Sequence, residues 1–100
     1  MMTAKEARHN TDARISDVTA RAKELLSKDV LGINLKIEEA ITSCQNKVKF
    51  EVSKFFKDYG FRSEEEQNIF MTTCHNYFKD LGYAVGSWEV LYGIMFEISW

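Results

Sequence analysis

The residues best suited to nucleophilic catalysis in this chain are Cys74 and its neighbour His75. A thiol nucleophile needs a histidine base within hydrogen-bond reach. Consecutive residues of a helix point about 100° apart, so these two side chains do not face each other. The sequence also has no GxGxxG, P-loop, HExxH or GxSxG motif. We therefore predict that the protein is not an enzyme.

Three consecutive glutamates, residues 64–66, could in principle hold a metal or act as a general acid. Negative charge is favoured in the first turn of a helix, and Ser63 followed by Glu66 forms a capping-box pattern. This pattern explains the acidic run without a ligand. The two cysteines, Cys44 and Cys74, have no CxxC partner and are predicted to be reduced, partly buried thiols. We expect no metal and no cofactor.

Positive charge gathers in residues 47–62, which hold five basic residues and two acidic ones, whereas residues 63–100 hold one basic residue and six acidic ones. Lys47 and Lys49 would share the outer face of a strand, and Arg62 is near in sequence. Such side chains bind phosphate groups. A solvated strand face needs no ligand, and we favour that interpretation while leaving phosphate binding open.

Aromatic residues are dense in the C-terminal third, which contains Tyr77, Phe78, Tyr83, Trp88, Tyr92, Phe96 and Trp100. A core helix and a core strand account for Phe78 and Phe96. Trp88 and Tyr92 fall in or near a predicted loop, where large aromatic residues mark a protein interface or a platform on which a base stacks. An oligomer contact is the simpler of these two interpretations.

The elements that position these residues begin with a helical pattern over residues 3–27. Its apolar stripe is narrow and starts only at Ile15, so the first turns either project into solvent or lie against another subunit. We predict an N-terminal helical arm, 1–28, and a compact domain, 29–100, within a single domain overall. A second apolar series follows Gly32, and one kinked helix or two helices fit this pattern equally well.

The segment KVKFEV, from Lys47, alternates as a half-buried strand does, and the following residues are ambiguous between strand and helix. A helix is predicted over 64–81. Two further strands, YAV and IMFEISW, would be joined by a loop from Gly86 to Gly93. The predicted fold class is therefore α+β, with a long N-terminal helix or two helices, then a small antiparallel sheet with one packed helix. Trp100 would either cap the core, which we favour, or line a groove.

Composition restricts the class of protein further. One hundred residues make one domain, and a formal charge of −2 argues against a protein that coats DNA. No apolar run approaches the roughly 18 residues of a membrane span. The first ten residues, MMTAKEARHN, are too polar for a signal peptide. We expect a soluble cytoplasmic protein with neither membrane nor DNA as its partner.

Three short motifs resemble a widespread group of small phage-encoded proteins: TAKEAR at 3–8, LGYAV at 81–85 and ISW at 98–100. Members of that group open with a polar AKEAR-like helix, continue through an Ile-rich helix, a short strand and a helix, and finish with LGY-x-V and ISW. Some of them are similar to sponge proteins that counter bacterial cyclic-nucleotide defence. Such sponges bind the signal without cleaving it, as homo-oligomers with ligand pockets between subunits.

This resemblance implies a phage anti-defence protein that sequesters a cyclic nucleotide in the host cytoplasm. The ligand-binding residues expected from the family-like motifs are Lys5, Arg8, Tyr83, Ser99 and Trp100. Physical reasoning adds Trp88 and Tyr92, on which bases would stack. Two other functions remain open at this point: a structural or assembly protein of the phage particle, and a direct inhibitor of a host enzyme.

Overall fold

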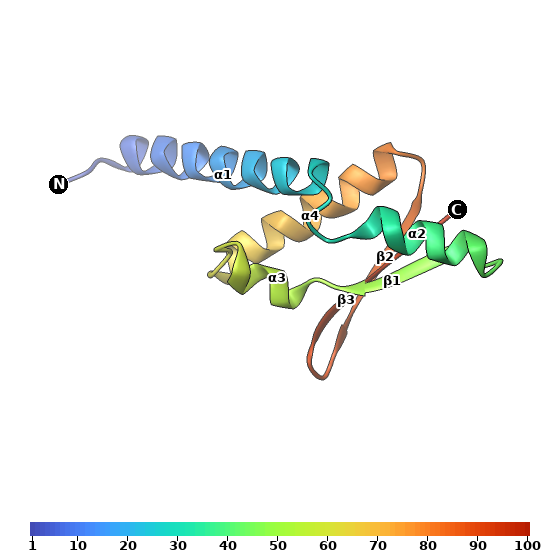
Figure 1. Ribbon diagram of the computed structural model, residues 1–100. Coiled ribbons are helices and arrows are strands. Elements are labelled where there is room, and N and C mark those ends of the chain that lie inside the picture. The colour runs from blue at the N-terminus through green and yellow to red at the C-terminus, as the bar shows by residue number, and fades with distance from the viewer.

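The computed structural model describes all 100 residues and contains four helices and a three-stranded sheet (Figure 1). The elements are α1 (Ala4–Ser27), α2 (Ile33–Thr42), β1 (Lys47–Glu51), α3 (Ser53–Asp58), α4 (Glu64–Asp80), β2 (Ala84–Val90) and β3 (Gly93–Ser99). All strands are antiparallel, in the order β1-β3-β2. The predicted α+β class is confirmed, and the segment that was ambiguous between strand and helix forms α3.

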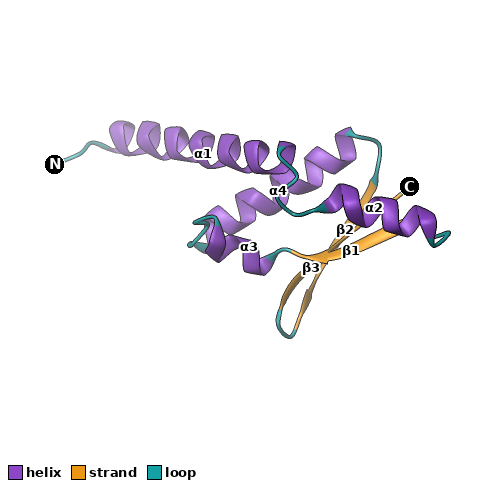
Figure 2. Ribbon diagram, viewed as in Figure 1, coloured by secondary structure: helices purple, strands orange, loops and turns teal.

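The helices gather on one side of the sheet (Figure 2). α4 packs against the strands, α2 lies beside β1, and α1 packs along α4. The core joins Phe70 and Phe78 of α4 to Phe50 and Phe96 of the sheet, all of them at most 5% exposed. Phe50 stacks on Phe96 with ring centroids 5.6 Å apart. Aromatic packing between α4 and the two strands therefore holds the sheet against the helices.

Residues 28–32, between α1 and α2, are not helical, so two helices, and not one kinked helix, is the correct interpretation. Asp29 and Gly32 both have positive φ, 52° and 68°, which a continuous helix does not allow. The Asp29 carboxylate accepts hydrogen bonds from the backbone N–H groups of Ile33, at 2.8 Å, and Asn34, at 3.1 Å. One side chain thus satisfies two of the free donors at the start of α2.

The first half of α1 forms an exposed arm, defined here as residues 4–17, none of which is buried. The buried residues of α1 are Val18, Ala22 and Leu26, and they belong to the same core cluster as the sheet. The arm extends to one side of the molecule (Figure 1), whose longest dimension is 60 Å. The sparse apolar stripe at the start of the sequence explains why this half of the helix has little to pack against.

The hairpin of β2 and β3 differs from the predicted loop. Only Leu91 and Tyr92 connect the strands, because pairing continues to Val90 and Gly93. The predicted loop from Gly86 to Gly93 is therefore wrong, and residues 86–90 belong to β2. Gly86 is compatible with a strand, whereas Gly93 has φ +154° and an added Cβ would lie 2.8 Å from Glu51 Oε1. Close packing against the side chains of Ser53 and Glu51, not a loop, accounts for the second glycine.

Candidate ligand-binding face of the sheet

The sheet has one face that no helix covers. Strand side chains alternate between two faces, and the buried set, which includes Val48, Phe50, Phe96 and Ile98, points toward the helices. We call the opposite surface the outer face. Its residues are Lys47, Lys49, Glu51, Ala84, Gly86, Trp88, Val90, Met95, Glu97 and Ser99. An aromatic residue, two lysines, two glutamates and a hydroxyl thus share one open surface.

Trp88 and Lys49 contact each other across the outer face. The Lys49 Nζ lies 5.8 Å from the centroid of the Trp88 ring, within the range of a cation–π interaction. Trp88 is 39% exposed, and it lies opposite Met95 in the register. Gly86, two residues before it on the same face, leaves open space in place of a side chain. The indole is therefore partly exposed, and the Lys49 ammonium lies over its ring.

Two of the predicted binding residues, Trp88 and Ser99, belong to this face. Ser99 lies at the far end of β3, where it pairs with Lys47 of β1 and Ala84 of β2. Lys47 and Lys49 follow one another along β1 on the same face, about 7 Å apart. The sequence pattern KVKFEV predicted that both lysines share one strand face, with a solvated face favoured and phosphate binding left open, and neither lysine was among the predicted site residues.

Tyr83 and Trp100 lie at the end of the core instead. Their rings meet edge to face with centroids 6.1 Å apart, and Tyr83 in turn contacts Phe78 at 6.2 Å. The backbone N–H of Trp100 donates to the backbone carbonyl of Asn46 at 3.0 Å. Trp100 is nevertheless 43% exposed, so it extends the aromatic core to the surface. Tyr83 thus packs against the core, whereas Trp100 contacts the Tyr83 ring and is partly exposed, so the choice between a core cap and a groove residue for Trp100 stays a prediction.

The remaining predicted residues are distant from the outer face within one chain. Tyr92 is at the tip of the hairpin and is 73% exposed. Lys5 and Arg8 are exposed on the arm, at the other end of the molecule from Trp100 (Figure 1). One chain therefore does not bring the seven predicted residues into a single site.

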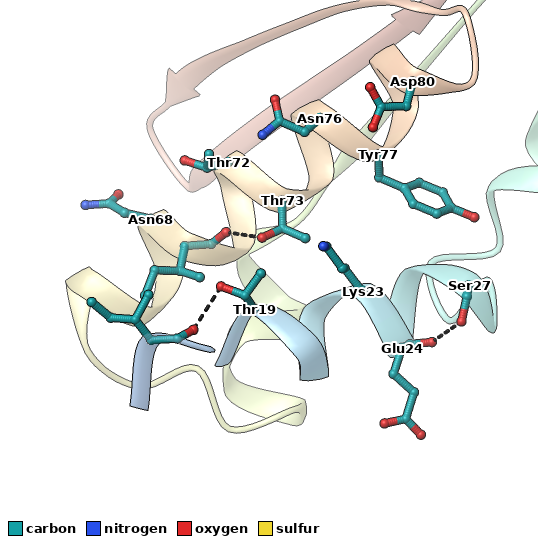
Figure 3. A pocket seen from close by; sticks show the side chains of 12 residues that line it. Thr19, Lys23, Glu24, Ser27, Asn68, Thr72, Thr73, Asn76, Tyr77 and Asp80 are labelled. Carbon is teal, nitrogen blue, oxygen red and sulfur yellow. Dashed lines mark hydrogen bonds between the residues drawn. The ribbon is translucent and has the colours of Figure 1, made fainter. Parts of the chain in front are cut away.

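A groove between α1 and α4 was not anticipated from the sequence (Figure 3). It encloses about 860 Å³ and is lined mainly by polar side chains. The hydroxyls of Thr19, Ser27 and Thr73 donate to carbonyls of their own helices at 2.8 Å. Figure 3 shows the Glu24 carboxylate pointing away from α4, and the nearby Lys28 ammonium lowers the pKa of Glu24. Much of the polar lining is thus already engaged within each helix.

The thiols differ in environment. Cys44 is exposed and Cys74 is completely buried, so the prediction of two partly buried thiols is wrong. Loss of solvation raises the pKa of the Cys74 thiol to about 12. The Cys74 thiol is therefore protonated at neutral pH, and burial alone explains this without an interaction with His75. No three His, Cys, Asp or Glu side chains are grouped to hold a metal ion.

This difference predicts the outcome of thiol labelling. In the native protein at pH 8, an aromatic disulfide reagent is expected to modify one thiol per chain rapidly, at Cys44, while Cys74 reacts only after denaturant is added. The reason is that Cys74 has neither exposure nor thiolate character. A Cys44→Ser variant is the control and should show no rapid phase. Rapid labelling of two thiols in the native protein would contradict the burial of Cys74.

None of the helices combines the length and the apolar character that crossing a membrane requires. The longest, α1, has 24 residues and many charged side chains. Comparison with models of protein families, with curated proteins and with solved structures found nothing that matches this chain.

Proposed function

We propose that this protein binds a nucleotide on the outer face of its sheet and sequesters it without cleaving it, as a phage anti-defence sponge for a cyclic nucleotide signal. The observation that carries the proposal is the exposed Trp88 ring with the Lys49 ammonium 5.8 Å from its centroid. A nucleotide is the ligand class that combines a flat base with a phosphate. An aromatic ring and an adjacent cation complement those two parts.

The energetics favour such a ligand. Stacking of a base on an aromatic side chain contributes about 1–3 kcal/mol, and each lysine adds a phosphate contact that weakens with salt. Lys47 lies along β1 from Lys49 and opposite Ser99, so a second phosphate and a sugar hydroxyl have partners on the same face. This geometry supports a cyclic di- or trinucleotide over a small metabolite.

In a homo-oligomer, predicted binding residues that lie far apart within one chain would come together from two subunits. The arm is exposed along residues 4–17, and it bears Lys5 and Arg8 of the family-like motif. In an oligomer, the arm of one subunit would supply these cations to the outer face of a neighbour. Tyr83 and Trp100 pack at the end of the core, on the opposite side of the sheet from Trp88, so they are not part of the proposed ligand site.

The test is a thermal-shift panel of cyclic dinucleotides, cyclic trinucleotides and cyclic ADP-ribose isomers. We expect one class to raise the melting temperature and to be recovered chemically intact after the protein is denatured by heat. Ligand at 100 times its dissociation constant stabilises the folded state by about 2.7 kcal/mol. Trp88→Ala is expected to weaken binding about 5- to 150-fold, which corresponds to the 1–3 kcal/mol of one stacked base.

A matched control is available on α3. The Lys54 Nζ lies 5.4 Å from the Phe55 ring, so this pair has the same chemistry away from the outer face. Lys49→Gln is expected to weaken binding and to reduce its salt dependence, whereas Lys54→Gln should leave both unchanged. No shift with any nucleotide, or equal losses in both lysine variants, would overturn the proposal.

The exposed arm favours one alternative, a structural or assembly protein of the phage particle. A helix that is exposed over residues 4–17 has a free surface for another protein. Such a protein would be found by mass spectrometry in purified virions, where a sponge would not be present in stoichiometric amounts. A third function, direct inhibition of a host enzyme, would instead give co-purification with one host protein.

A further inference from the structure

The two edges of the sheet are protected very differently. β1, five residues long, carries Lys47 and Lys49 and has α2 beside it. β2 is longer, at seven residues, and its sequence, AVGSWEV, has neither lysine nor proline. Lysine, proline, short length and covering elements are the features that keep edge strands from pairing with other chains. Each edge strand contacts one helix, α2 at β1 and α4 at β2, so the features that β1 has and β2 lacks are the short length and the lysines.

The backbone groups that β2 leaves unpaired can be identified from its neighbour. The Ile94 N–H donates to Ser53 Oγ at 2.6 Å, and the Ile94 carbonyl accepts from the Val52 N–H at 3.1 Å. Both groups of Ile94 therefore point toward the β1 side of β3. Glu89 lies opposite Ile94 in the register, so it is not hydrogen-bonded to that residue.

Hydrogen-bonded and non-hydrogen-bonded pairs alternate along an antiparallel ladder, so every second residue of β2 resembles Glu89 in this respect. Val85, Ser87 and Glu89 direct their backbone N–H and carbonyl groups away from β3, toward the free edge. None of the backbone hydrogen bonds outside the helices and strands involves residues 84–92. Ser87 and Glu89 are also exposed. The edge therefore presents three donors and three acceptors in a regular row.

We infer that the partner of this edge is a second copy of the same chain, paired antiparallel through β2 about a two-fold axis at Ser87. In this register residues 84–90 pair with residues 90–84, so the whole strand is used. The outward-facing groups meet as hydrogen-bonded pairs, with Ser87 opposite its symmetry mate and Glu89 opposite Val85 of the second copy. The single charge of β2 thus faces an apolar residue and not another carboxylate.

In this register, the side chains of the two copies also fit together on the outer face. Trp88 of each copy lies opposite Gly86 of the other, where the absence of a side chain leaves room for the indole. An aromatic residue opposite a glycine is a recurrent way of stabilising a strand pair. The two indoles become diagonal neighbours about 7–8 Å apart. Pairing therefore produces a six-stranded sheet whose outer face has two adjacent tryptophans at its centre.

This assembly goes beyond nucleotide binding and is tested without any ligand. Light scattering after size exclusion should give the wild-type protein twice the 11.6 kDa mass of one chain. Ser87→Pro removes an N–H that points to the free edge and spares the ladder with β3, so it should halve the mass with an unchanged circular dichroism spectrum. Ser87→Ala keeps that N–H and should remain a dimer. A monomeric wild type, or a Ser87→Pro variant that stays dimeric, would overturn the inference.

Cross-linking tests the register even if Ser87→Pro fails to fold. In a Cys44→Ser background, Ser87→Cys should form a disulfide-linked dimer on mild oxidation, since facing residues of a hydrogen-bonded pair have Cα atoms about 5.5 Å apart. Glu89→Cys is the matched control. Its symmetry mate would be about 13 Å away along the strand, so it should not cross-link. Equal cross-linking at both positions, or none at Ser87→Cys, would contradict the proposed register.

Discussion

Replacing Phe96 with alanine is expected to lower the free energy of unfolding by about 3–5 kcal/mol. Phe96 is fully buried in the central strand, where it lies between Phe50 of β1 and Ser87 of β2. Its ring stacks on that of Phe50. Truncation removes this packing and leaves a cavity between the sheet and α4. Because small domains have total stabilities of about 5–15 kcal/mol, this single change would leave the protein close to unfolding at body temperature.

Urea denaturation followed by circular dichroism measures this loss. Tyr92→Ala is a suitable control, since that ring is 73% exposed at the hairpin tip and its removal should change stability by less than about 0.5 kcal/mol. A loss below about 1 kcal/mol for Phe96→Ala would show that Phe96 is not packed in the core as described.

Gly93→Ala is expected to have a similarly large effect, a loss of about 2–5 kcal/mol. A methyl group at residue 93 would lie 2.8 Å from Glu51 Oε1 and 2.9 Å from Ser53 Cβ. The φ of +154° adds backbone strain for any residue with a Cβ. Overpacking of this kind costs about 1–3 kcal/mol and the unfavourable backbone adds about 1–2 kcal/mol. The loss should be seen in the same urea experiment.

The same hairpin contains the control for this substitution. Gly86 has no heavy atom within 4 Å of an added Cβ, and its φ is not in the positive range. In a Ser87→Pro background, where no second copy packs over residue 86, Gly86→Ala is therefore expected to change stability by no more than about 0.5 kcal/mol. Equal losses at the two glycines would mean that the hairpin itself, and not the contact with Ser53 and Glu51, limits which residues position 93 tolerates.

Local sequence signals predicted the elements that depend on local interactions. The helix expected over 64–81 is observed as α4, and Ser63 Oγ accepts a hydrogen bond from the Glu66 N–H at 3.1 Å, as the capping box requires. The alternation of polar and apolar residues from Lys47 likewise predicted β1. In both cases the information lies within a few residues of the chain, so no tertiary contact is needed to find it.

The hairpin and the outer face depend on partners distant in sequence. Gly86 interrupts the apolar alternation of β2, and only pairing with β3 makes residues 86–90 a strand. Trp88, which was predicted to lie in or near a loop, is therefore part of β2. Its contact with Lys49 joins residues 39 positions apart on two strands that are not neighbours. The sequence indicated Lys49 as a possible phosphate contact and Trp88 as a possible stacking residue. It did not predict that the two side chains lie together on one surface.

The order β1-β3-β2 also has a consequence for how the protein folds. The central strand follows both of its neighbours in the chain, and β1 pairs with residues more than 40 positions later. During synthesis, β1 and β2 therefore emerge with no partner, and the sheet closes in one late step when residues 93–99 leave the ribosome. Such long-range pairing slows folding and leaves apolar strands exposed in the meantime. The nascent chain should consequently be most vulnerable to proteases and to aggregation just before its last strand appears.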